Sequence, residues 1–153
     1  MCNTAPFLDG TLLNFVVPHV LELIYTAHDL APLAHDCGYD GPPFRWDEDR
    51  RFQIRAELDA AYLHAYLGPS DAWRPAPAET AEDLSRLRAH FPTPKDAAAH
   101  ILNSFPIVRE KDEAAHGSYR TRDTILALYE AFTIAHRNHQ PWSSPLNPPP
   151  GRT

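Results

Sequence analysis

The stretch that decides the fold is Gly38-Tyr-Asp-Gly-Pro-Pro-Phe-Arg-Trp-Asp47, which leads into a helical pattern that continues to about Leu67. Within it, Asp40-Gly41 is typical of a turn, and Pro42-Pro43 imposes an extended backbone. Such a density of residues that restrict the backbone, set beside aromatic and charged side chains, specifies one local structure. We therefore predict a tight connector followed by a long helix.

Four residues of this connector are expected to have structural roles. The turn needs a glycine, two aromatic side chains should be buried and hold the connector on the core, and an aspartate should cap the helix. A short acidic side chain at this position accepts a hydrogen bond from an amide of the first helical turn. Gly41 is the glycine of the turn, Phe44 and Trp46 are the aromatic residues, and Asp47 is the capping aspartate.

A second distinctive stretch, Asn103-Ser-Phe-Pro-Ile-Val-Arg-Glu-Lys-Asp112, runs on to Thr121. Pro106 suits the first turn of a helix, and Gly117 suits its end. We predict a short charged helix between them and expect Thr121 to cap the next helix. The turn at Gly117 should bring two charged segments close together.

The remaining helices follow from apolar spacing and from capping signals. A main helix is expected from about Pro18 to Leu30, because proline fits best at a helix start. Thr80 with Asp83 resembles a capping box. The other expected ranges are 80–91, 93–103 and a last helix with its buried face at Ile125, Leu128, Tyr129 and Phe132.

No segment alternates between apolar and polar residues over a convincing length, so no strand is predicted. The expected fold is all-α, a compact bundle of about five or six helices joined by Pro-rich connectors. We expect residues 1–139 to form a single helical domain and residues 140–153 to form an extended, Pro-rich tail.

The formal net charge of -6 argues against a self-sufficient DNA-binding domain, because such domains normally carry net positive charge. Of the 14 Lys and Arg residues only Lys95 and Lys111 are lysines. Arginine suits bidentate contacts to phosphate and guanine. Two cysteines form no disulfide framework, and no apolar stretch is long enough for a membrane span. Together with the lack of a secretory signal, this predicts a cytoplasmic protein.

Motifs that would carry chemistry are missing. The nine histidines do not form the compact ligand pairs of a zinc site, and no Gly-rich loop cradles phosphate. A metal-dependent nuclease needs an acid two positions before a lysine, whereas Thr93 precedes Lys95 and Arg109 precedes Lys111. Asn147-Pro-Pro-Pro150 is similar to a base-pocket motif but lacks its aromatic residue. We expect no catalytic, cofactor-binding or metal-binding residue in the chain.

Two basic sets are the candidates for contact with DNA. Each set is interleaved with acidic residues, so intramolecular salt bridges and solvated helix faces are the alternative reading for both. The better candidates surround the second distinctive stretch and are Arg109, Lys111, Arg120 and Arg122. The other candidates, on the long helix, are Arg50 and Arg51.

Taken together, several segments resemble the C-terminal region of large bacterial adenine-specific DNA methyltransferases of type IIG-like restriction-modification and phage-defence systems. The similarity covers most of the chain from about Phe15 to Phe132. The segments are Val17-Pro-His-Val-Leu-Glu-Leu-Ile-Tyr-Thr-Ala-His-Asp-Leu-Ala-Pro32, Gly38–Glu48, Arg55-Ala-Glu-Leu-Asp-Ala-Ala-Tyr62, Phe91-Pro-Thr-Pro94, Phe105-Pro-Ile-Val108, Lys111-Asp-Glu113 and Gly117-Ser-Tyr-Arg-Thr121.

Enzymes of that family transfer a methyl group from S-adenosylmethionine to adenine. Their cofactor and base-binding motifs lie upstream of this region and have no counterpart here, so the resemblance implies a chain that is inactive alone. It implies a non-catalytic segment that supports the methyltransferase body, in cis or in trans, with DNA as a weak further partner. The alternative is a stand-alone helical protein-interaction module of a phage-defence system.

Overall fold

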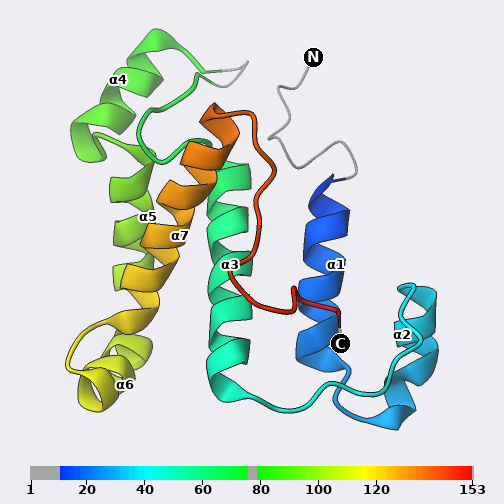
Figure 1. The fold of residues 1–153 in the computed structure, drawn as a ribbon. Coiled ribbons are helices and arrows are strands. Elements are labelled where there is room, and N and C mark those ends of the chain that lie inside the picture. Colours follow the sequence, from blue (N-terminus) through cyan, green and yellow to red (C-terminus); the bar gives the residue numbers. More distant parts are fainter. Residues whose placement is uncertain (1–10, 76–78, 153) are drawn as a thin grey trace. The chain divides into compact units, whose positions relative to one another are not determined.

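The computed structural model describes residues 11–75 and 79–152, and every regular element in them is helical. The elements of the described residues are seven α-helices, which are labelled in Figure 1, and one short 3-10 helix. The all-α prediction is therefore confirmed, with slightly more helices than expected. In chain order the elements are α1 (Thr11–Ile24), η1 (His28–Leu30), α2 (Ala31–Asp36), α3 (Glu48–Leu67), α4 (Ala81–His90), α5 (Pro94–Asn103), α6 (Pro106–His116) and α7 (Arg120–Arg137).

The described residues divide into two units, and the division falls within α3. Unit 1 is built from Asp59–Trp142, and unit 2 from residues 11–58 together with residues 143–152. The predicted domain of residues 1–139 stays a prediction. Residues 140–152 contain no helix, but they bend at 145–148 and turn at 150–151.

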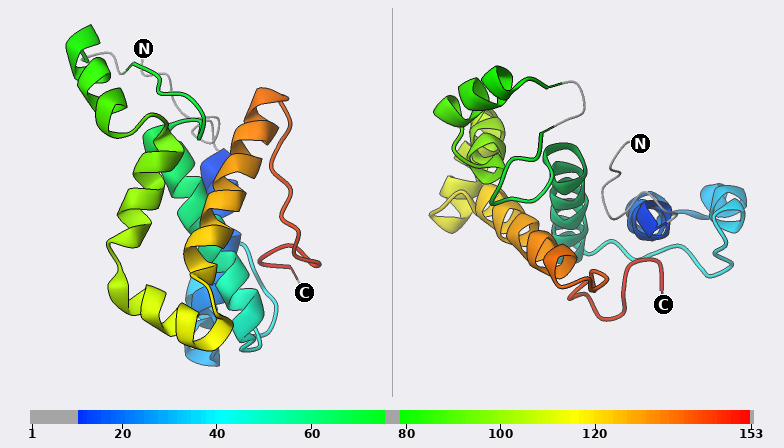
Figure 2. Two further views of the ribbon diagram at one scale, coloured as in Figure 1. Left: turned by 90° about the vertical axis from the view of Figure 1, so that its left-hand side faces the viewer. Right: turned by 90° about the horizontal axis from the view of Figure 1, so that it is seen from above.

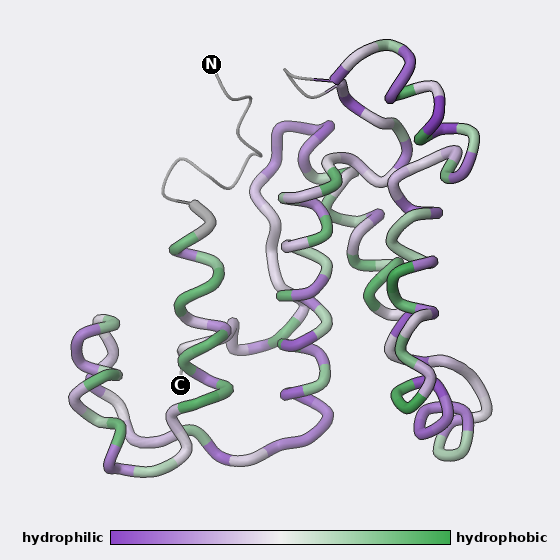
Figure 3. Tube along the Cα trace, turned by 180° about the vertical axis from the view of Figure 1, so that it is seen from behind, coloured by the Kyte–Doolittle hydropathy of each residue, from purple (hydrophilic) through white to green (hydrophobic). Residues whose placement is uncertain are grey.

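Helix α7 is the centre of unit 1, where it packs against both α5 and α6 (Figure 2). Its predicted buried face is confirmed, because Ile125, Tyr129 and Phe132 are each at most 1% exposed. The phenol of Tyr129 donates a hydrogen bond to the Gly68 carbonyl at 2.7 Å, which ties the end of α3 to α7. Hydrophobic and hydrophilic residues are interspersed along the helices (Figure 3).

The helix starts follow the capping chemistry that the sequence predicts. Thr80 and Asp83 form a complete capping box on α4. The side chain of Thr93 accepts the amide of Asp96 in the same way on α5. Asp47 caps α3, where its carboxylate accepts the amide of Arg50 at 3.0 Å. Each of these contacts satisfies an amide that has no partner within its helix.

In the connector before α3 the prediction for Phe44 is confirmed and the one for Trp46 is wrong. Phe44 is 8% exposed and stacks on Tyr39 with 4.8 Å between ring centroids. A side chain at Gly41 would collide with the Tyr39 ring, since its Cβ would lie 2.4 Å from the hydroxyl. Trp46 is 66% exposed, and its ring lies under the guanidinium of Arg51 at the start of the helix that follows, α3.

Two predicted helix starts are also wrong. Pro18 lies inside α1, which begins at Thr11 and ends at Ile24. The apolar run before Pro18 extends the helix in the N-terminal direction, and the Nδ1 atom of His19 lies 2.6 Å from the Phe15 carbonyl in that turn. Helix α7 begins at Arg120, with Tyr119 in place of Thr121 as its N-cap residue.

Candidate functional site

The basic side chains at the junction of α6 and α7 are largely engaged within unit 1. The guanidinium of Arg109 donates to Glu113 at 2.7 Å, and this contact raises the Arg109 pKa above its ordinary value. Arg122 donates to Asp123 at 2.7 Å and lies over the ring of Tyr119. Both side chains therefore make intramolecular ion pairs, which is the arrangement that the salt-bridge interpretation expects.

Lys111 and Arg120 are on the same junction. Lys111 is exposed, and Arg120 lies 3.5 Å from the ring of His116. As expected, the turn at Gly117 brings the two charged segments together, because Asp112 on α6 accepts the backbone amide of Thr121 on α7. Contact of this junction with DNA stays a prediction.

The other two candidates, Arg50 and Arg51, make contacts inside unit 2. Arg50 forms a two-pronged ion pair with the buried carboxylate of Glu22. Arg51 donates to the carbonyl of Leu23 at 2.9 Å and covers Trp46. These arginines hold α3 to the end of α1, so their guanidinium groups are directed inward.

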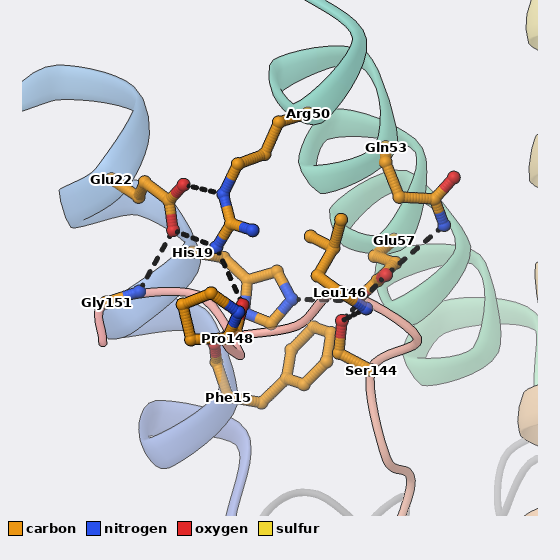
Figure 4. Close-up of polar contacts among 10 residues, drawn as sticks. All are labelled: Phe15, His19, Glu22, Arg50, Gln53, Glu57, Ser144, Leu146, Pro148 and Gly151. Carbon is orange, nitrogen blue, oxygen red and sulfur yellow. Dashed lines mark hydrogen bonds and ion pairs between the residues drawn. The ribbon is translucent and has the colours of Figure 1, made fainter. Parts of the chain in front are cut away.

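Unit 2 contains a cluster of buried polar side chains between α1 and α3 (Figure 4). His19 and Glu22, on one face of α1, are 4% and 6% exposed, and Glu57 on α3 is fully buried. The Nε2 atom of His19 lies 2.9 Å from a carboxylate oxygen of Glu57. Burial of ionisable groups is costly unless they are paired, and here each carboxylate has a basic partner.

Residues 144–151, named the strap here, cross this cluster as a non-helical segment with bends at 145–148 and a turn at 150–151 (Figure 4). The Ser144 hydroxyl donates to Glu57 at 3.0 Å, and the Gly151 amide donates to Glu22 at 3.1 Å. The Pro148 carbonyl accepts from Arg50 at 2.9 Å. The strap is thus attached to the cluster by three hydrogen bonds, two of which involve its backbone.

Unit 1 contains an apolar groove of about 500 Å³. It is formed by the end of α3, by α5, by the start of α6 and by the start of α7. Asp59 is the single charged residue among those that line it. The lining residues are Asp59, Tyr62, Leu63, Tyr66, Leu67, Ile101, Leu102, Phe105, Val108, Tyr119, Thr121 and Ile125.

Several of these lining side chains are exposed to solvent although they are large and apolar. Tyr66 is 84% exposed, Phe105 is 51% exposed and Ile101 is 44% exposed. Ile107, next to the lining residue Val108, is 66% exposed. Contiguous apolar surface of this kind is uncommon on a soluble protein unless it binds something.

Sequence reasoning did not identify the groove or the buried cluster. Tyr62 and Tyr66 are one helical turn apart, which is a signal for a shared face. The spacing of His19 and Glu22 likewise places them on one face of a helix. The residues that complete the groove and the cluster come from segments far away along the chain, so no local sequence pattern predicts them.

The described residues contain no group of three or more His, Cys, Asp and Glu side chains placed to hold a metal ion. None of the described helices is long and apolar enough to cross a membrane. No protein-family model, curated protein or solved structure matches this chain. The relationship to adenine-specific methyltransferases therefore stays a prediction that depends on the residues quoted above.

Proposed function

We propose that this chain is a non-catalytic helical docking module whose apolar groove receives a helix from the body of an adenine-specific DNA methyltransferase. The body belongs either to the same polypeptide or to a separate one. The observation that carries the proposal is the groove of about 500 Å³ with its exposed aromatic rim. The identity of the partner comes from the sequence resemblance.

The rim favours a protein occupant over a small molecule. Tyr66 and Phe105 line the cavity and are still 84% and 51% exposed, so its apolar surface reaches well into solvent. Tyrosine and phenylalanine are enriched at the centres of protein interfaces, where they supply large contact areas at low entropic cost. An amphipathic helix lying in the groove would cover both the cavity and its rim.

The charge of the groove disfavours nucleic acid as its occupant. Phosphate contacts depend on lysine and arginine, and neither lines the groove. The one charged lining residue, Asp59, is acidic and repels phosphate. We therefore expect the occupant to present leucine, isoleucine or phenylalanine side chains, with a basic residue on the side that faces Asp59.

The test is calorimetry between the purified chain and the methyltransferase body of the same system. Tyr66→Ser and Phe105→Ser should each weaken binding at least tenfold, because aromatic residues at interface centres contribute about 2 kcal/mol or more. Ile134→Ser is the matched control, since Ile134 is 56% exposed on α7 but does not line the groove. Circular dichroism checks that the variants remain folded.

Unchanged affinity in both groove variants would overturn the groove as the docking site. Failure of the methyltransferase body to bind at all would overturn the assignment of the partner. If a different protein of the same system then bound, and Tyr66→Ser weakened that binding, the chain would be a stand-alone interaction module.

A further inference from the structure

A second cavity of unit 1 is lined mainly by charged and titratable side chains. It has a volume of about 300 Å³ and lies between the connector after α3 and the end of α7. It shares no lining residue with the apolar groove, so its occupant is independent of the docking proposal. The charged and titratable residues in its wall are Asp71, Arg74, His136, Arg137 and His139.

Two guanidinium groups face one carboxylate in this wall. Asp71 is paired with Arg137 on α7, and the two charges compensate each other. Arg74 comes from the connector, and none of the ion pairs among the described residues includes it. The wall therefore contains one positive charge for which the described residues supply no carboxylate.

The partner of Arg74 is an imidazole. Its Nη2 atom lies 3.2 Å from the Nε2 atom of His136. A guanidinium has donors and no acceptor, so Nε2 accepts this hydrogen bond with its lone pair. Burial lowers the pKa of His136 below its ordinary value, and the nearby Arg74 and His139 lower it further. Arg74 thus donates to a neutral acceptor, and an anion would be a stronger partner.

The end of α7 does not need Arg74 for its own capping. Cations are favoured near the C-terminus of a helix, where the last carbonyls lack partners within the helix. Here the carbonyls of Ile134, Ala135 and His136 accept the backbone amides of residues 138–140. In the described part of the chain, Arg74 donates to the ring of His136, 62 residues later, and to none of these carbonyls. The capping of α7 therefore does not explain why this guanidinium lies at the cavity.

We propose that this cavity binds a phosphate group, either free phosphate or the phosphate of a small phosphomonoester. Arg74 offers the planar set of N–H donors that matches phosphate oxygens, and the exposed ring of His139 adds a further donor. Phosphate has more acceptor oxygens and a higher charge than a carboxylate, so it gains more from donors on two segments. The volume of about 300 Å³ is at the lower end for ligand sites and admits a phosphate with a small organic group.

Asp71 is a competitor of phosphate within the site. Its side chain is 49% exposed and that of Arg137 is 64% exposed, so solvent screens their ion pair. A phosphate in the cavity competes with Asp71 for Arg137 and is repelled by the carboxylate. Removal of this carboxylate should therefore strengthen phosphate binding, whereas removal of the Arg74 guanidinium should weaken it.

The experiment is NMR on the full chain near neutral pH and at fixed ionic strength. The reporters are the ring signals of His136 and His139 and the side-chain N–H signal of Arg74. Sodium phosphate and glycerol phosphate are titrated in parallel, and both should shift the reporters in a saturable manner. The tighter of the two shows whether free phosphate or a phosphomonoester is the ligand. Acetate at the same concentrations should bind several-fold more weakly than phosphate.

Arg74→Gln should weaken phosphate binding about tenfold, because it removes a charged donor from the site. Asp71→Asn should strengthen binding several-fold. The matched controls are Arg88→Gln and Glu110→Gln, which change the net charge by the same amounts at exposed positions of unit 1 outside the cavity. Neither control should change the affinity for phosphate.

Three results would each overturn the site: phosphate that leaves the reporters unchanged, acetate that binds as tightly as phosphate, or affinities that change as much in the controls as in the cavity variants. Circular dichroism checks that each variant is folded. If Arg74→Gln fails to fold, Asp71→Asn with its control and the acetate comparison still decide the question.

Discussion

The backbone amide of Ser70 donates to the hydroxyl of Thr133 at 2.8 Å, and the same hydroxyl donates to the Tyr129 carbonyl at 3.0 Å. Ser70 and Thr133 are each 4% exposed. One buried side chain thus satisfies a polar group of the connector after α3 and a polar group of α7. Buried amides that lack such a partner are rare because they are costly.

Thr133→Val should therefore destabilise the protein by about 1–3 kcal/mol, since it leaves the Ser70 amide buried without an acceptor. Thr133→Ser keeps the hydroxyl and should cost clearly less. Urea unfolding of the two variants beside the wild type measures the difference. Equal destabilisation by valine and serine would show that the methyl group matters and the hydrogen bond does not.

His64 should make the protein less stable in acid. Burial lowers the pKa of its ring to about 4, and the nearby His136 and Arg74 add to this effect. The unfolded chain takes up the proton near pH 6.5 and the folded one near pH 4, so the contribution of His64 is complete above pH 6.5 and is lost between these values.

Because the His64 side chain is 1% exposed, the loss should approach about 3 kcal/mol at the acidic end of this window. The measurement is the pH dependence of the urea midpoint from pH 4 to pH 7 in the wild type and in His64→Leu. The wild-type curve should be the steeper of the two. Parallel curves would contradict the prediction.

Trp46→Ala should cost less than about 1 kcal/mol, because the exposed ring loses mainly its contact with Arg51 and a hydrogen bond to Glu48. Phe44→Ala removes a buried ring and should cost about 3–5 kcal/mol. The urea unfolding midpoints of the two variants, each compared with the wild type, measure both costs. A cost for Trp46→Ala as large as that for Phe44→Ala would show that the ring is buried in solution.

DNA binding by this chain alone should be weak and strongly dependent on salt, since a net charge of -6 repels the duplex. Four phosphate contacts at the α6–α7 junction would give a log–log salt slope of about -3.6. Replacing Arg120 and Arg122 together should flatten this slope by about two units if both contact phosphate. Unchanged binding would assign the two side chains to intramolecular contacts.

Local chemistry explains how much of the fold was predictable. Thr80, Asp47 and the glycine at position 117 determine helix ends through contacts within a few residues, and these predictions were confirmed. Pro18 was misplaced because the rule for proline at helix starts is a preference, and the apolar residues before it continue the helix. Trp46 was misplaced because an aromatic residue in a rigid connector carries no sign of which way its ring points.

The candidate sites were less predictable for a different reason. The groove depends on four helices, and its lining residues read individually as core positions. The strap attaches mainly through the Pro148 carbonyl and the Gly151 amide, and backbone atoms leave no signature in a sequence. Of their partners, Arg50 was predicted only as a member of a basic set on the long helix, and no role was predicted for Glu22.

The chain order of the strap has a consequence for synthesis. Unit 2 starts before unit 1 along the chain, yet residues 143–152 follow all of unit 1. A ribosome therefore delivers α1, α2 and the start of α3 long before the segment that covers Glu22 and Glu57. Synthesis of unit 1 is complete before the last segment of unit 2 is made. This reverses the usual order, in which N-terminal parts fold ahead of later ones. Until translation passes residue 151, the carboxylates of unit 2 are open to water and to other proteins.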